Sequence, residues 1–128
     1  VKIFYDPKKI SYEKLLHVFW RSVDPTDDGG QFCDRGHSYK TAIFAKGDEQ
    51  LKIANASKKV IEKAKLLKDP IVTPILKAGS FFRAEEYHQD FHNKSAVRYN
   101  YYRYNCGRNA RVKSIWGKEA YSAIPKKK

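Results

Sequence analysis

Three side chains with distinct chemistry stand together in the run Gln31-Phe-Cys-Asp-Arg-Gly-His-Ser-Tyr-Lys40. The Asp34 carboxylate can accept a proton, the Tyr39 phenol can donate a hydrogen bond to an oxygen, and the Cys33 thiol can change its redox state. Gly36 lies between the carboxylate and the phenol. These residue types in one short segment predict a site that polarises an oxygen atom beside a thiol.

A second cysteine, Cys106, lies in the strongly basic C-terminal region between Arg103 and Arg108. Either guanidinium would favour the thiolate form if it pointed toward the sulfur. Two cysteines are too few for a disulfide scaffold, so they indicate a reducing compartment or a single redox pair. The alternative for Cys33 is a small buried thiol, because free cysteine is among the most buried residue types.

The elements that must position these residues are predicted to alternate between strands and helices. Ser11 and Asp48 are expected to cap the first two helices, and apolar side chains at Ile53, Ala56, Val60, Ala64 and Leu67 are expected to form the buried stripe of the second. We expect strands at 1–6, 39–45 and 71–78, helices at 12–23, 49–68 and 85–93, and a glycine-bearing loop at 26–36. This order predicts an α+β fold, a mixed sheet with helices packed on it in a two-layer sandwich.

Length and composition predict one globular domain over residues 1–128, with a basic C-terminal tail at 118–128. No leader and no apolar run of membrane-spanning length is visible, so we expect a cytoplasmic monomer that does not enter membranes. The chain opens on Val1 inside an expected strand and contains no methionine. We therefore expect an incomplete domain, truncated at its N-terminus, that bares a sheet edge and apolar surface and folds poorly alone.

The net charge of +12 keeps a second class of function open. Between Tyr99 and Lys113, tyrosines alternate with arginines, and this pattern suits base stacking and phosphate neutralisation. No recognised nucleic-acid motif accompanies the tract, so the predicted binding is weak, non-specific and dependent on salt.

A metal site is not expected. His88 and His92 are spaced by one helical turn, but no cysteine or third histidine stands at a supporting spacing. A structural role is the better prediction, with His88 or Gln89 hydrogen-bonded to the backbone.

Several runs together resemble the peptide-methionine sulfoxide reductase A (MsrA) family, from Val1 to about Gly117. They are Phe19-Trp20, Asp24-Pro25, the run around Asp34, and Glu85-Glu-Tyr-His-Gln-Asp90. The resemblance implies an oxidoreductase that reduces methionine-S-sulfoxide, in proteins or free, without a cofactor. It would use thioredoxin as reductant and serve protein repair under oxidative stress. Asp34 and Tyr39 match the family's Asp-x-Gly-x-x-Tyr motif residue by residue.

The resemblance also implies roles for residues outside that motif. Cys106 becomes the expected resolving cysteine, with Cys33 as the alternative. Tyr104 becomes the expected pocket-lining tyrosine, in competition with Tyr99, Tyr101 and Tyr102. The family's nucleophilic cysteine lies in a Gly-Cys-Phe-Trp motif that does not occur in these residues. The chain alone is therefore expected to be inactive, and a non-catalytic remnant that keeps a binding surface is a further alternative.

Overall fold

The structure, a computed structural model, describes residues 1–125; the last three residues of the expected basic tail lie outside the described residues. Its helices are α1 (Tyr12–Trp20), α2 (Gly47–Lys63), α3 (Phe91–Lys94), α4 (Ala96–Asn105) and α5 (Arg108–Trp116). Its strands are β1 (Gly30–Gln31), β2 (Asp34–Arg35), β3 (Ile43–Ala45) and β4 (Ile75–Lys77). Short 3-10 helices occupy His37–Tyr39, Glu86–His88 and Gly117–Glu119.

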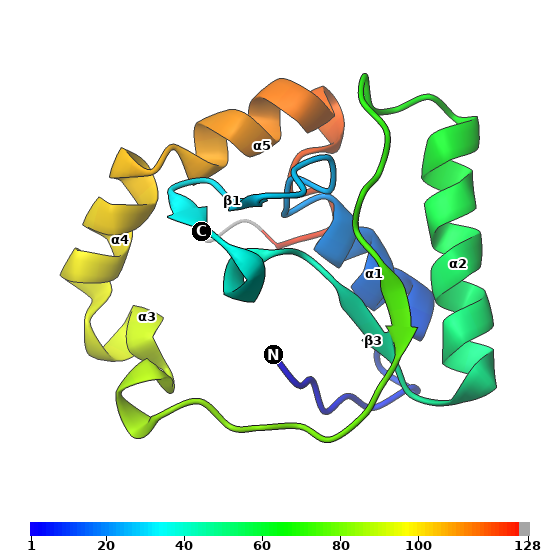
Figure 1. Cartoon of the computed structure of the whole chain (residues 1–128), viewed down its shortest axis with the longest axis horizontal. Coiled ribbons are helices and arrows are strands. Elements are labelled where there is room, and N and C mark those ends of the chain that lie inside the picture. Colours follow the sequence, from blue (N-terminus) through cyan, green and yellow to red (C-terminus); the bar gives the residue numbers. More distant parts are fainter. Residues whose placement is uncertain (126–128) are drawn as a thin grey trace.

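The strands form two separate pairs of opposite type. β1 and β2 make an antiparallel hairpin, whereas β3 and β4 run parallel with Ile43 opposite Ile75. The helix α2 follows β3 and lies beside the parallel pair, and α3, α4 and α5 form an arc around the opposite side of the molecule (Figure 1). Helices packed on small strand pairs of both types confirm the α+β class.

The core joins α1, α2 and α5. Trp20 is fully buried and packs in one cluster with Ile61 of α2 and with Val112 and Trp116 of α5. A buried indole needs a hydrogen-bond acceptor, and the Trp20 Nε1–H donates to Ser57 Oγ of α2 over 2.9 Å. The C-terminal helix α5 is therefore part of the core.

The first helix is the best-predicted element. Ser11 has an extended backbone and its side chain accepts a hydrogen bond from the Lys14 N–H, as expected for an N-cap. The helix ends at Trp20, three residues earlier than predicted, and the Arg21 carbonyl instead accepts a hydrogen bond from the Tyr121 N–H over 3.0 Å.

The predictions for α2 were wrong in two respects. Lys46, not Asp48, is the N-cap, and the helix stops at Lys63, before Lys65 takes a left-handed backbone. The buried positions are Ala54 and Ile61, whereas Val60 is 63% exposed. Of the predicted stripe, Ile53 and Leu67 are partly buried against the core. Polar Ser57 also lies on the inner face because it accepts the Trp20 hydrogen bond, so counting apolar residues alone placed the stripe correctly only in part.

The predicted strands are shorter or absent. Residues 1–6 form no ladder with any part of residues 1–125, and Tyr39 lies in a 3-10 helix before β3. Only Ile75–Lys77 of the third expected strand pairs, because Pro74 has no N–H to donate; its carbonyl accepts from Ile43 N over 3.0 Å. A segment with high strand propensity forms a strand only where a second strand lies beside it.

Two elements beyond the expected ones dominate the C-terminal third. The stretch that was expected to be merely aromatic and basic forms α4 and α5. Val112, Ile115 and Trp116 follow helical spacing, and Gly107 takes a left-handed backbone between the two helices. That spacing was a readable signal for α5. Within residues 1–125, no helix is both long and apolar enough to cross a membrane.

The outward face of the parallel pair is apolar and open. Phe44 and Leu76 are 62% and 48% exposed, while Ile43 and Ala45 on either side of Phe44 are buried. Strand side chains alternate between two faces, so one face enters the core and the other meets solvent. The expected exposure of apolar surface is present.

The alternation along β3 predicts unequal costs for truncating adjacent residues. Ile43→Ala should lower the free energy of unfolding by about 2–5 kcal/mol, because it leaves a cavity in the core. Phe44→Ala should cost less than about 1 kcal/mol, because its ring is mostly in water. Urea unfolding followed by tryptophan fluorescence measures both variants. Equal losses would contradict the burial pattern.

Candidate redox site at the hairpin tip

The β1–β2 hairpin presents Phe32 and Cys33 at its turn. Phe32 takes a left-handed backbone, and the Gly36 N–H donates to the Gly29 carbonyl over 2.8 Å to close the hairpin base. Gly30 has a φ of +147°, and a Cβ there would overlap the Asp34 carbonyl oxygen. The segment expected to be an irregular loop is thus a tight hairpin that aims Cys33 away from the core.

The two cysteines form a disulfide. Cys33 and Cys106 are 73 residues apart in the chain, and their Cα atoms lie 5.2 Å apart. Cys106 caps the C-terminus of α4. The structure thus joins the two cysteines in one pair, and the free buried thiol offered as the alternative for Cys33 is wrong.

Asp34 is bound by a tyrosine that the motif did not select. The Tyr102 hydroxyl of α4 donates a hydrogen bond to Asp34 Oδ1. This hydrogen bond raises the pKa of Tyr102 above its ordinary value, and burial and the nearby Asp34 and Tyr39 add to the rise. Tyr102 and Cys106 are one helical turn apart, so they share a face of α4. In the sequence, the four-residue spacing of Tyr102 and Cys106 was the one sign that Tyr102 lies near the cysteine pair.

The other candidate tyrosines lie differently. Tyr39 is 52% exposed in its 3-10 helix, near enough to Tyr102 to influence its titration. Tyr104 is 84% exposed, and Tyr101 is also exposed. Tyr99 accepts a hydrogen bond from Arg103 Nη1 over 2.9 Å. The structure therefore brings Asp34, Cys33 and Cys106 together with Tyr102, and leaves Tyr104 in solvent.

One of the two expected arginines, Arg108, stacks on the residue that precedes Cys33. The Arg108 guanidinium is 4.4 Å from the centroid of the Phe32 ring, next to Cys33. Burial, and then repulsion from Arg103, lower the pKa of Arg108. Arg103 instead donates to Asn109 Oδ1 and to Tyr121. The positive charge near the cysteine pair thus comes from α5.

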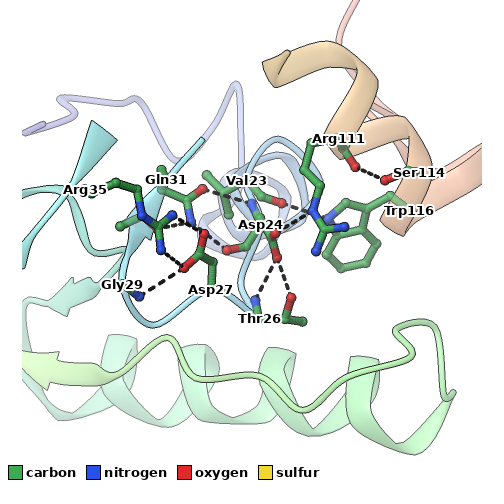
Figure 2. Close-up of polar contacts among 11 residues, drawn as sticks. Val23, Asp24, Thr26, Asp27, Gly29, Gln31, Arg35, Arg111, Ser114 and Trp116 are labelled. Carbon is green, nitrogen blue, oxygen red and sulfur yellow. Dashed lines mark hydrogen bonds and ion pairs between the residues drawn. The ribbon is translucent and has the colours of Figure 1, made fainter. Parts of the chain in front are cut away.

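The hairpin base is tied to α5 by a buried carboxylate (Figure 2). Asp24 is 3% exposed, and its Oδ1 accepts from both the N–H and the hydroxyl of Thr26. Its Oδ2 accepts from Arg111 Nε over 2.8 Å. The Asp24 backbone exchanges two hydrogen bonds with the Gln31 amide, at 3.0 and 2.7 Å. One residue therefore joins the loop, β1 and α5.

The disulfide borders an open cavity of about 560 Å³. The lining includes Asp24, Phe32, Cys33, Cys106 and Arg111. The cysteine pair is therefore next to a space that another molecule can enter.

The histidines of the expected third helix lie at the surface. His88 lies 3.6 Å from Glu85 and His92 lies 3.8 Å from Asp90, each as a pair of ionisable groups. Nearby, Gln89 Nε2 donates to the Ala84 carbonyl over 2.9 Å, as predicted for a structural role. No group of three or more histidine, cysteine or acidic residues in the described part of the chain is arranged to hold a metal ion.

A disulfide paired with a hydrogen-bonded carboxylate and tyrosines defines a thiol–disulfide site, and comparison with known proteins gives its family. Residues 1–120 match the family model described as peptide methionine sulfoxide reductase. The chain belongs to that family.

Curated relatives and a solved structure agree. The chain is 51% identical over 119 residues to peptide methionine sulfoxide reductase MsrA of Bacillus licheniformis, covering 93% of this chain and 66% of that protein. It is 49% identical to the Bacillus subtilis MsrA, covering 91% of this chain and 66% of the relative. The crystal structure of Mxr1 from Saccharomyces cerevisiae in reduced form superposes with a TM-score of 0.67 at 34% identity, over 72% of this chain and 50% of that one. The chain thus spans slightly less than two thirds of the length of these curated relatives.

The buried carboxylate predicts a strong effect on stability. Asp24→Ala should lower the free energy of unfolding by about 3 kcal/mol, because the Thr26 N–H and Arg111 lose a buried acceptor. Asp28 is exposed in the same loop and provides the matched control: Asp28→Ala should change stability by less than about 0.5 kcal/mol. Denaturant unfolding of both variants tests this, and similar small losses would show that Asp24 does not anchor the loop.

The hairpin base also predicts a loss of stability in acid. Two hydrogen bonds from Arg35, at 2.5 and 2.8 Å, lower the pKa of Asp27 most strongly, against an opposing effect of burial. A carboxyl with a lowered folded-state pKa contributes stability above its unfolded pKa and loses that contribution as pH falls through the folded value. Asp27→Asn should therefore flatten the decline of stability in acid, while Asp28→Asn should leave it unchanged. Melting temperatures are measured from neutral to acidic pH. Parallel curves for the native chain and Asp27→Asn would show that the Asp27–Arg35 pair has no such effect.

Proposed function

We propose that this chain supplies the oxygen-binding and thiol-recycling parts of a reductase for methionine-S-sulfoxide, free or in proteins. The observation that carries the proposal is the Cys33–Cys106 disulfide, which adjoins the hydrogen-bonded pair of Asp34 and Tyr102. Membership of the family and the open cavity beside the disulfide support it.

The reaction needs two electrons and two protons for each sulfoxide. A thiolate attacks the sulfoxide sulfur, the oxygen is protonated, and methionine leaves while the attacking cysteine becomes a sulfenic acid. A second thiol displaces water from the sulfenic acid and forms a disulfide. A reductant dithiol then returns both cysteines to thiols and is itself oxidised to a disulfide, so the electrons balance.

We assign the residues of this chain to two stages of that cycle. Asp34 and Tyr39 act before methionine leaves: the Tyr39 phenol donates a hydrogen bond to the sulfoxide oxygen, and the Asp34 carboxylate orients that donor or a water. Cys106 acts afterwards as the resolving thiol. Cys33 then attacks Cys106, releases the first cysteine and forms the Cys33–Cys106 disulfide, which is the species that the reductant reduces.

The nucleophile of this scheme lies outside the 128 residues, which contain two cysteines and no Gly-Cys-Phe-Trp motif. The chain alone should therefore not turn over methionine-S-sulfoxide with dithiothreitol. The assay compares methionine release with a control without protein. A clear rate above that control would contradict the proposal and would identify Cys33 or Cys106 as a substitute nucleophile.

The division of roles is tested by joining a Gly-Cys-Phe-Trp-bearing family segment to this chain. In single-turnover assays, Asp34→Asn or Tyr39→Phe should slow the first release of methionine about 10²-fold, because the phenol that donates to developing charge is lost or is no longer oriented by a carboxylate. Tyr104→Phe, which removes the hydroxyl of a solvent-exposed tyrosine, is the control variant for Tyr39→Phe.

The same joined protein separates the two cysteines. Cys106→Ser should leave the first release nearly intact and abolish cycling with thioredoxin, since the resolving step follows methionine release. If Cys106→Ser still cycles while Cys33→Ser does not, the resolving role passes to Cys33.

Thioredoxin is the proposed reductant, the monomer the proposed functional state and the cytoplasm the proposed compartment. For nucleic acid we propose only weak contact that is lost at physiological salt, because the basic surplus provides phosphate contacts without a base-reading device. The tyrosine tract supports this limit, since Tyr99 and Tyr102 are engaged within the protein.

A further inference from the structure

We infer that Tyr102 covers the Asp34 carboxylate through a hydrogen bond that depends on the Cys33–Cys106 disulfide. The oxidation state of the cysteine pair would thereby decide whether a phenol from α4 occupies the Asp34 carboxylate. Any effect of this hydrogen bond on catalysis rests on the proposed function of Asp34. The coupling between the hydrogen bond and the disulfide does not.

Two neighbouring links join α4 to the hairpin. Cys33 and Asp34 are consecutive in the hairpin, and Tyr102 and Cys106 are one turn apart on α4. The disulfide connects one member of each pair, and the hydrogen bond connects the other. The covalent link thus holds Tyr102 within reach of Asp34.

Apart from these two links, α4 is held mainly by exposed or half-buried polar contacts, such as those from Arg103 to Asn109 and Tyr121. None of its residues is buried, whereas α5 buries Val112 and Trp116 in the core. In the described part of the chain, the Tyr102 hydrogen bond is the one that joins α4 directly to the hairpin. A segment with few buried contacts opens at low free energy, so loss of the disulfide should free α4 while α5 stays packed.

The groups around the Asp34 carboxylate would remain near it after the Tyr102 hydrogen bond is lost. Arg108 of α5 feels the Asp34 charge, and Tyr39 acts on the Tyr102 phenol. When α4 leaves, these two groups stay with the hairpin and α5. Reduction would therefore free Asp34 to orient a proton donor or a water at the substrate oxygen, and oxidation would cover it again after each turnover.

The test is a tyrosine-ring NMR titration of this chain without any sulfoxide. The Tyr102 resonance is assigned by its loss in Tyr102→Phe. In the disulfide form, Tyr102 should titrate at higher pH than in the Asp34→Asn variant. In the Cys33→Ser/Cys106→Ser variant, which adds no thiolate charge, that difference should vanish. A difference that persists there, or one absent from the disulfide form, overturns the inference.

A second measurement does not depend on the double variant folding. Amide hydrogen exchange is compared in the native chain before and after reduction at neutral pH. Reduction should speed exchange in α4 by about tenfold or more while α5 keeps its protection. Unchanged exchange in α4 would contradict the inference. Neither readout uses reductase activity, so an inactive joined protein would refute the proposed function and leave this coupling to stand or fall on its own data.

Discussion

The Asp24 carboxylate is the interaction on which the arrangement of this molecule depends. It is removed from water and accepts hydrogen bonds from Thr26 and Arg111, while its backbone binds the Gln31 amide. Burying a carboxylate is unfavourable unless its oxygens are satisfied, so these contacts must form together. They connect the hairpin base to α5, and the chemistry of the hairpin tip follows from that connection.

The anchored and the loosely held parts of the chain have different tasks. The helix α5 is fixed twice, by Arg111 on Asp24 and by the Trp116 indole, which donates to the Val23 carbonyl over 2.9 Å. It carries Arg108 to a fixed place over Phe32. The preceding helix α4 buries no residue and is held by the disulfide, the Tyr102 phenol and the hydrogen bonds of Arg103 to Asn109 and Tyr121. A redox site of this kind combines a rigid base with a segment that covalent chemistry can attach or release.

The strands β3 and β4 also combine a buried face with an open one. Phe44 and Leu76 are open to solvent although Ile43 on the same ladder is in the core. The parallel pair is short, and Pro74, which has no N–H to donate, limits its length. Stability therefore comes mainly from α1, α2 and α5 around Trp20 rather than from the sheet.

Local signals in the sequence sufficed for some features and failed for others. The Ser11 cap of α1 was predictable because a cap is made by residues three positions apart. The inner face of α2 was predictable only in part, because half-buried Ser57 lies on it through a hydrogen bond from Trp20 of another helix. The expected strand at residues 1–6 failed for a related reason: a ladder needs a second strand beside it.

For the candidate site, the sequence by itself determined the chemistry: a carboxylate and a phenol in a recognisable family motif, and two thiols outside it. Only the tertiary structure decided the pairing. It joined Cys33 to Cys106 across 73 residues and chose Tyr102 over three nearby tyrosines as the partner of Asp34. The physical reason is that residue type fixes what a side chain can do, whereas a hydrogen bond or disulfide between distant segments depends on how α4 and the hairpin are packed.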